Sequence, residues 1–336
     1  MKELSPTKID PQPPQSHRFE SVFTQLEQNL RTLQKAYTLL KDFSCFQNTP
    51  ELETHLNKTH TLLKEAQAQQ APLKLLLLGG TGVGKSSLIN HLADQFISST
   101  SHSVRAHTRG FVVYLHASWK ERGTPDELNE IWPTELQELS SFSYHQIESL
   151  RSLWLIDAPD TDSIVSEHPQ RVEKALFEVD LPMWVSSPQN YRDHVNIEFL
   201  KLIDPKRPLL AIINQVDRLT KEEQSEVLSD AQDFINNLGF NDSQWFTTTC
   251  LDPKLSQLAS STDNSKQAAK AEASNKELHR LKSYLGQHFD RKEQARLKRL
   301  RLVQRLHESC EILHKPIQAI EAVSYTHLTL PTTPYV

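Results

Sequence analysis

Four of the eight glycines in this 336-residue chain fall between Gly79 and Gly84, and this clustering constrains the fold more than any other feature. Backbone without a Cβ can approach a ligand closely, so the cluster predicts one loop shaped around a ligand. The residues before it, Leu73 to Leu78, are apolar except for Lys74, which is typical of a buried parallel strand. A helical pattern begins at Ser87. The region therefore predicts a strand, a tight loop and a helix in succession.

The loop sequence matches GxxxxGK followed by Ser or Thr, the pattern of phosphate-binding loops. In such a loop, backbone N–H groups and the N-terminus of the next helix surround phosphate oxygens. Lys85 would place its charge at the β- and γ-phosphates, and the Ser86 hydroxyl would ligate Mg²⁺. The residues expected to contact the nucleotide here are Gly79, Gly80, Thr81, Gly82, Val83, Gly84, Lys85, Ser86 and Ser87.

A second element distinguishes guanine from adenine. An apolar run from Leu209 to Ile213 leads into Asn214-Gln215-Val216-Asp217, which resembles the NKxD element of GTP-binding proteins. The Asp217 carboxylate would accept hydrogen bonds from guanine N1 and N2, a pattern that adenine does not offer. Asn214 would tie this loop to the phosphate-binding loop, and Gln215, in place of the usual lysine, could lie along the purine face.

The stretch from Thr247 to Cys250 resembles the last guanine-binding loop of these proteins. Thr249 and the backbone N–H of Cys250 would then contact the base. The end of a buried strand explains the same residues almost as well, so both interpretations stay open at this point.

Magnesium and hydrolysis are predicted to depend on residues between these elements. Leu153 to Ile156 ends in Asp157-Ala158-Pro159-Asp160, where GTPases carry DxxG, and Asp157 would hold Mg²⁺ through a water molecule. Asp160 replaces the glycine whose N–H meets the γ-phosphate, and Thr161 replaces the water-orienting glutamine of Ras-like proteins. We therefore expect hydrolysis to be slow, stimulated by a partner, or organised differently.

Thr108 is the expected switch threonine, because it precedes the apolar run that begins at Phe111 and follows Ser86 at a plausible interval; Thr100 is its competitor. The expected catalytic residues are thus Lys85, Thr108 and Asp157. The expected metal ligands are Ser86, Thr108 and Asp157.

These elements resemble those of Era-like and dynamin-like GTPases of the translation-factor-related class. The resemblance is closer to bacterial dynamin-like GTPases, which carry DxPDxDS together with NQVDRL, here residues 157–163 and 214–219. It implies an α/β P-loop GTPase (Ras-like) fold, with a doubly wound, mainly parallel sheet and flanking helices. It also implies Mg²⁺-dependent hydrolysis of GTP to GDP. In such relatives a membrane-associated region often follows the G domain.

The pattern of apolar residues divides the chain. A disordered arm at 1–17 is followed by a helical hairpin at 18–71 and a G domain at 72–290. Within that domain we expect a helical insertion at 118–151, with its helix near Glu127 to Leu139, and a flexible excursion at 253–276.

A basic helical extension is predicted at 276–322, with the cations between Arg291 and Arg305 on a solvated face. That face could instead meet a membrane surface, ribosomal RNA or an acidic partner. Residues 323–336 break the helical pattern and are interpreted as a non-native tail.

Charge and cysteine content exclude several classes of protein. A formal net charge of -5 gives no basis for sequence-specific DNA binding, and three widely spaced cysteines give none for a disulfide framework. No apolar window is long enough to span a bilayer. We expect a cytoplasmic protein, or one peripheral at the inner face of the membrane, whose helical arms allow self-association.

Hydrolysis of GTP as a conformational switch is the preferred hypothesis. Asp160 and Thr161 leave open a scaffold that binds GTP tightly but hardly hydrolyses it. The third alternative is an ATP-binding P-loop protein in which Asn214 and Asp217 occur by chance.

Overall fold

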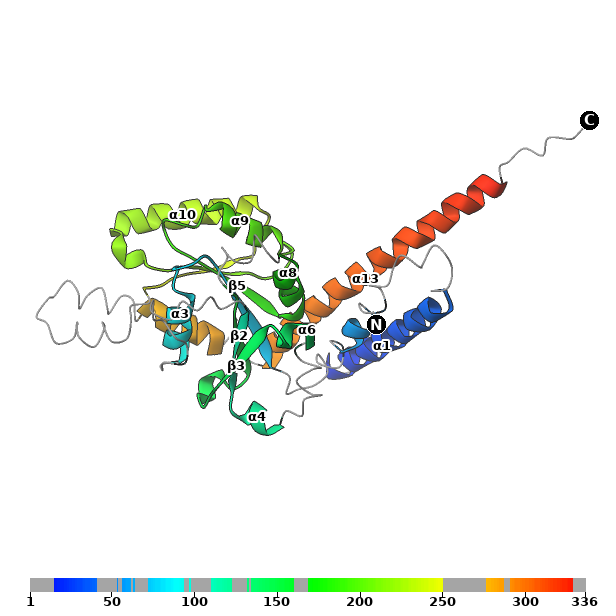
Figure 1. Cartoon of the computed structure of the whole chain (residues 1–336), viewed down its shortest axis with the longest axis horizontal. Coiled ribbons are helices and arrows are strands. Elements are labelled where there is room, and N and C mark those ends of the chain that lie inside the picture. Colours follow the sequence, from blue (N-terminus) through cyan, green and yellow to red (C-terminus); the bar gives the residue numbers. More distant parts are fainter. Residues whose placement is uncertain are drawn as a thin grey trace, which may run out of the picture. The chain divides into compact units, whose positions relative to one another are not determined.

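A computed structural model describes the chain in two compact units (Figure 1). Residues 70–297 form one, called here the sheet unit, and residues 1–69 with 298–336 form the other, called the helical unit. The described residues are 15–40, 53, 56–61, 63, 72–93, 97, 110–122, 132, 134–159, 169–249, 276–286 and 291–328. The predictions for most of the arm and for 253–275 of the excursion lie outside these residues.

The sheet unit is built on seven strands in the order β3-β2-β4-β1-β5-β6-β7. All neighbouring strands are parallel except β2 with β4. This arrangement confirms the predicted α/β fold with a doubly wound, mainly parallel sheet. The strands are β1 (Leu73–Leu78), β2 (Phe111–His116), β3 (Ser140–His145), β4 (Leu153–Asp157), β5 (Leu181–Ser186), β6 (Leu210–Ile213) and β7 (Gln244–Thr247).

Helices cover both faces of this sheet, because successive strand side chains point to opposite sides. Leu75 and Leu77 of β1 lie in the apolar cluster that includes α3 and the helix at 276–286, whereas Leu76 and Leu78 lie in the cluster of α8 and α10. The helices of this unit are α3 (Lys85–Ala93), α4 (Ser118–Arg122), α6 (Thr134–Gln137), α8 (Pro169–Glu178), α9 (His194–Lys201), α10 (Lys221–Asn237) and 276–286, with 3-10 turns η2 (Glu148–Leu150) and η3 (Val216–Arg218).

The insertion at 118–151 differs from its prediction, since it contains a strand as well as helices. Strand β3 pairs in parallel with β2, in register from Phe111 with Ser140 to His116 with His145, and extends the sheet at its edge. Of the helix expected near 127–139, the described residues show only the short α6.

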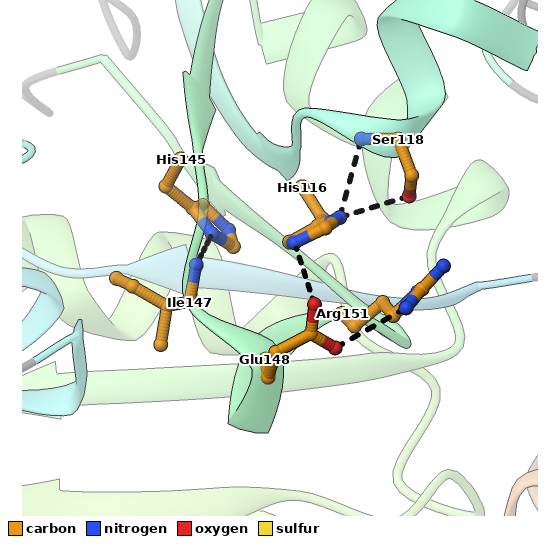
Figure 2. A network of polar contacts seen from close by, with 6 residues as sticks. All are labelled: His116, Ser118, His145, Ile147, Glu148 and Arg151. Atoms are coloured by element: carbon orange, nitrogen blue, oxygen red, sulfur yellow. Dashed lines mark hydrogen bonds and ion pairs between the residues drawn. The ribbon is translucent and has the colours of Figure 1, made fainter.

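The carboxyl ends of β2 and β3 carry two buried histidines, His116 and His145, whose rings meet edge to face at 5.8 Å (Figure 2). Each ring accepts at Nδ1 a backbone N–H from two residues further on, Ser118 and Ile147, both at 3.2 Å. Nδ1 is an acceptor in both rings, so Nε2 carries the proton. Burial, followed by the effect of His116, lowers the pKa of His145 to about 4.

This histidine pair is linked to the turn that precedes β4. His116 Nε2 lies 3.6 Å from a carboxylate oxygen of Glu148, and Glu148 accepts a hydrogen bond from Arg151 at 3.2 Å (Figure 2). The network therefore joins the added strand to η2, and through it to β4.

The helical unit is assembled from both ends of the sequence. Helix α1 (Gln15–Leu40) buries Leu30 and Tyr37 together with Leu56, and Leu306 and Ile312 of α13 (Arg291–Leu328) pack against them. A helix from a distant part of the sequence thus packs in the region that was predicted as a hairpin of residues 18–71 alone. Helix α1 begins inside the predicted arm, and α13 continues through 323–328, beyond the predicted end at 322.

The basic face of α13 also differs from its prediction. Lys298, Arg301 and Arg305 are only 3%, 4% and 2% exposed, although the sequence predicts a solvated face. A charge pattern along a helix does not show which parts of the chain pack over it. These three cations are therefore removed from any electrostatic surface. Within the described residues, no helix is both long and apolar enough to cross a bilayer.

Candidate functional site

The glycine-rich loop leaves β1 and enters α3 with backbone that only glycine tolerates. A Cβ on Gly79 would clash with the carbonyl oxygen of Val185, and a Cβ on Gly84 would clash with the side-chain amide of Asn214. Gly84 also has a φ of 96°, in the region that side chains disfavour. The loop is therefore packed closely against the ends of β5 and β6, and the glycine pattern has a steric cause.

Lys85 is the first residue of α3 and is 7% exposed. Its ammonium donates hydrogen bonds to the carbonyl oxygens of Gly79 at 2.9 Å and Gly80 at 3.3 Å. The positive charge is thus held against the loop, next to the N-terminus of a helix whose dipole also favours an anion. Together these groups make a site suited to phosphate oxygens.

Ser86 and Asp157 place two hard oxygen atoms close together beside this loop. The Ser86 hydroxyl donates to a carboxylate oxygen of Asp157 at 3.4 Å. Asp157 ends β4, which lies next to β1 in the sheet, and is 9% exposed. Mg²⁺ commonly binds through one or two protein oxygens together with phosphates and waters, so this pair fits a magnesium ion.

A single amide joins three loops at the carboxyl edge of the sheet. Asn214 is fully buried; its Nδ2 donates to the Val83 carbonyl at 2.8 Å and its Oδ1 accepts from the Thr248 hydroxyl at 3.0 Å. The loops after β1, β6 and β7 are thereby held in one frame. The link expected from the sequence between Asn214 and the phosphate-binding loop is present.

Gln215 makes a second link to the same loop. Its Nε2 donates to the Gly82 carbonyl at 2.8 Å. Its φ is 63°, and among the described residues it is the only non-glycine with positive φ. The side chain therefore lies against the phosphate-binding loop, where the sequence had suggested the purine face.

Asp217 lies in the η3 turn that follows Gln215 and is partly exposed. The backbone N–H of Val216 reaches the Thr248 carbonyl at 3.4 Å, which brings this turn beside the loop after β7. Thr249 of that loop is buried at 7% exposure. The structure thus brings the two elements that the sequence predicts around a guanine base beside each other, with the buried amide of Asn214 between them.

The remaining predicted residues behave differently. Ser87 is half-buried on α3, and Thr81 is exposed at the outside of the loop. Thr108, Asp160 and Cys250 lie outside the described residues, as do Thr100 and Thr161. The role of Thr248 was missed, although its place at the end of a possible buried strand could have suggested that its hydroxyl lies near Asn214, which also follows an apolar run.

The sequence matches no protein-family model and no curated protein. Several solved structures resemble the chain. One belongs to an oligomerised bacterial dynamin pair that senses and tethers membranes, at 14% identity and a TM-score of 0.47, covering 92% of this chain and 57% of that one. The chain thus spans little more than half the length of that relative.

Two further solved structures are shorter matches. Era of Aquifex aeolicus, bound to GDP and aluminium fluoride, is 16% identical over 56% of this chain and 55% of its own, with a TM-score of 0.35. SelB of Methanococcus maripaludis, bound to a GTP analogue, is 16% identical over 54% and 30%, with a TM-score of 0.33.

Proposed function

We propose that this chain binds GTP and GDP with Mg²⁺ and hydrolyses GTP to GDP and phosphate as a conformational switch. The observation that supports this most directly is the position of Asn214, whose amide bonds to both the phosphate-binding loop and the loop after β7. A phosphate cradle and a base-recognition turn held in one frame are what recognition of a whole nucleotide requires.

In the proposal, the backbone N–H groups of residues 80–86 and the ammonium of Lys85 hold the β- and γ-phosphates. Lys85 would exchange its hydrogen bonds to Gly79 and Gly80 for phosphate oxygens. Ser86 and Asp157 would hold Mg²⁺, directly and through water. The ion supplies additional positive charge at the β- and γ-phosphates.

Guanine would be selected by Asp217, which accepts from N1 and the exocyclic N2. The loop with Thr249 and Cys250 would close the other side of the base. Gln215 would support the phosphate-binding loop from the base side through Gly82.

Hydrolysis adds water to the γ-phosphorus and breaks its bond to the oxygen that bridges to the β-phosphate, leaving GDP. Thr108 is proposed to complete the metal site when the γ-phosphate is present. Because Asp160 and Thr161 stand where a glycine and a glutamine are usual, the proposed rate is slow or partner-stimulated.

A nucleotide-dependent scaffold with little turnover is the second candidate, favoured by the same two residues. Self-association is proposed from the helical arms, and attachment to a membrane or ribosome from the basic helix at 276–322 and, for the membrane, from the sequence resemblance.

The test compares GTP and ATP binding to the full chain with Mg²⁺, by calorimetry, and then measures phosphate release. Asp217→Asn should weaken GTP binding about 100-fold, because two hydrogen bonds to a charged acceptor are lost. The same variant should gain affinity for xanthosine triphosphate, whose C2 carbonyl can accept from the new amide. The matched control is Asp242→Asn, an exposed carboxylate in the turn before β7.

Binding without phosphate release would favour the scaffold. Preference for ATP, or equal GTP affinity in Asp217→Asn and the control, would contradict the assignment of the guanine site.

A further inference from the structure

A groove of about 690 Å³ lies on the sheet unit, away from the phosphate-binding loop. It is formed by β7, the helix at 276–286 and the first turns of α13. Gln244, the first residue of β7, lines it, whereas the phosphate-binding loop follows the last residue of β1. Because β1 and β5 to β7 are parallel, the groove begins at the opposite edge of the sheet from the nucleotide site.

One face of the helix at 276–286 makes a wall of this groove. Lys276, His279, Arg280, Ser283 and Tyr284 line it, at the three- and four-residue spacing of a single helix face. The neighbouring face, with Leu278, Leu281 and Leu285, is buried in the core of the sheet unit. Burial of the apolar face therefore fixes the polar face toward the groove.

The charge of the groove is positive. Its lining holds the cations Lys276, Arg280 and Arg296 and a single carboxylate, Glu293, which gives +2 with His279 neutral. Glu293 already pairs with Arg296 at 2.6 Å, and Arg280 pairs with Glu277 at 3.2 Å. Both arginine side chains remain more than 60% exposed, so these are surface pairs that contribute little and leave donors for an anion.

Aromatic rings hold one of these arginines in place. The Arg280 guanidinium lies 5.3 Å from the centre of the Phe246 ring, and Tyr284 packs against the same ring at 5.3 Å. Phe246 is 3% exposed and belongs to the core. Burial, followed by the charge of Glu293, raises the pKa of Tyr284, so its hydroxyl stays protonated and can donate. The cationic groups are thus preorganised on a rigid base, which lowers the entropic cost of binding.

We propose that this groove is a second ligand site, which binds a compact small molecule carrying several phosphate groups. Apart from Phe246 and Glu293, every side chain of its lining can donate a hydrogen bond, and three of them are always charged at neutral pH. Lys276 and Arg280 on the helix at 276–286 and Arg296 on α13 can reach separate phosphate groups of one ligand. The volume lies within the range of small-molecule sites, roughly 300 to 1,000 Å³.

The test uses inositol hexakisphosphate as the probe, titrated calorimetrically into the full chain without Mg²⁺. Wild type should bind one equivalent at the groove. The double variant Arg280→Gln, Arg296→Gln should bind roughly tenfold more weakly or worse, since two charge-assisted contacts are lost. Thermal unfolding checks that it folds as wild type does, which the exposure of both arginines predicts.

Two controls separate the groove from other anion sites. Arg192→Gln removes an arginine that is 58% exposed and paired with Asp230 outside the groove, and should leave the affinity within about twofold. Lys85→Ala alters the phosphate-binding loop and should also leave it unchanged.

Three results would overturn the proposal. These are equal affinity in the double variant and wild type, loss of binding in Lys85→Ala, and tighter binding of a hexaglutamate peptide than of the phosphate probe. The last result would identify an acidic peptide as the occupant of the groove.

Discussion

In two parts of the central sheet, the strand ends are joined by different kinds of side chain. On the side of β1, β6 and β7, a buried asparagine amide joins the loops, and neither of its groups titrates in the physiological range. On the side of β2 and β3, two buried histidines close the strand ends, and burial lowers the pKa of one of them, His145, to about 4 (Figure 2). The stability contributed by the asparagine junction should therefore not change with pH, whereas the stability contributed by the histidine junction should.

The largest effect is expected from a substitution that removes the asparagine junction. Asn214→Ala leaves the Val83 carbonyl and the Thr248 hydroxyl without this partner, and we expect a loss of about 4 kcal/mol in the free energy of unfolding. Nucleotide binding should fall with it. Urea unfolding measures the first and calorimetry the second. Thr248→Val, which removes one of the two bonds, should cost less, and an equal cost would show that the junction does not act through Asn214.

The next largest effect is the pH dependence of stability that His145 should cause. His145 has a pKa of about 4 in the folded chain against 6.5 for an ordinary histidine, so the unfolded chain binds more protons between these values. The free energy of unfolding should thus fall as pH drops from about 6.5 to about 4, by up to about 3 kcal/mol from this residue.

His145→Gln should flatten that part of the stability curve, measured by unfolding at a series of pH values. His194→Gln provides the matched control, because the His194 side chain is 82% exposed. An unchanged pH slope in His145→Gln would show that the histidine pair does not respond to pH.

The smallest expected effect concerns Gln215. Gln215→Ala loses its hydrogen bond to Gly82 but keeps the positive φ, whereas Gln215→Gly loses the bond and relieves the backbone. We expect the alanine variant to be less stable than the glycine variant by about 1 kcal/mol. Thermal unfolding compares them, and equal stability would mean that the backbone strain at this position is negligible.

How well the sequence predicts each feature depends on how local its cause is. The glycine-rich loop between β1 and α3 can be predicted from neighbouring residues, because its glycines and Lys85 stand at fixed spacing after an apolar run. Strand β3 was missed because Ser140 to His145 contains three serines and lacks the apolar run of a central strand. The contact of Gln215 with Gly82 joins residues far apart in sequence, which a short motif does not reveal.

The same reasoning explains the helical parts. Lys298, Arg301 and Arg305 look like a solvated face, since a charge pattern does not show which neighbour covers it. The apolar spacing of α1 predicted a helix correctly but not its partner, Leu306, which lies almost three hundred residues further along the chain.

The packing of α1 with α13 in the helical unit has a consequence for how the chain folds during synthesis. A ribosome makes α1 before α13, so Leu30 and Tyr37 emerge long before the residues of α13 that pack against them. The sheet unit, encoded between them, can begin to fold during that interval, because domains generally fold as units while the chain is being made. The apolar face of α1 therefore stays without its α13 partners until the sheet unit has been made.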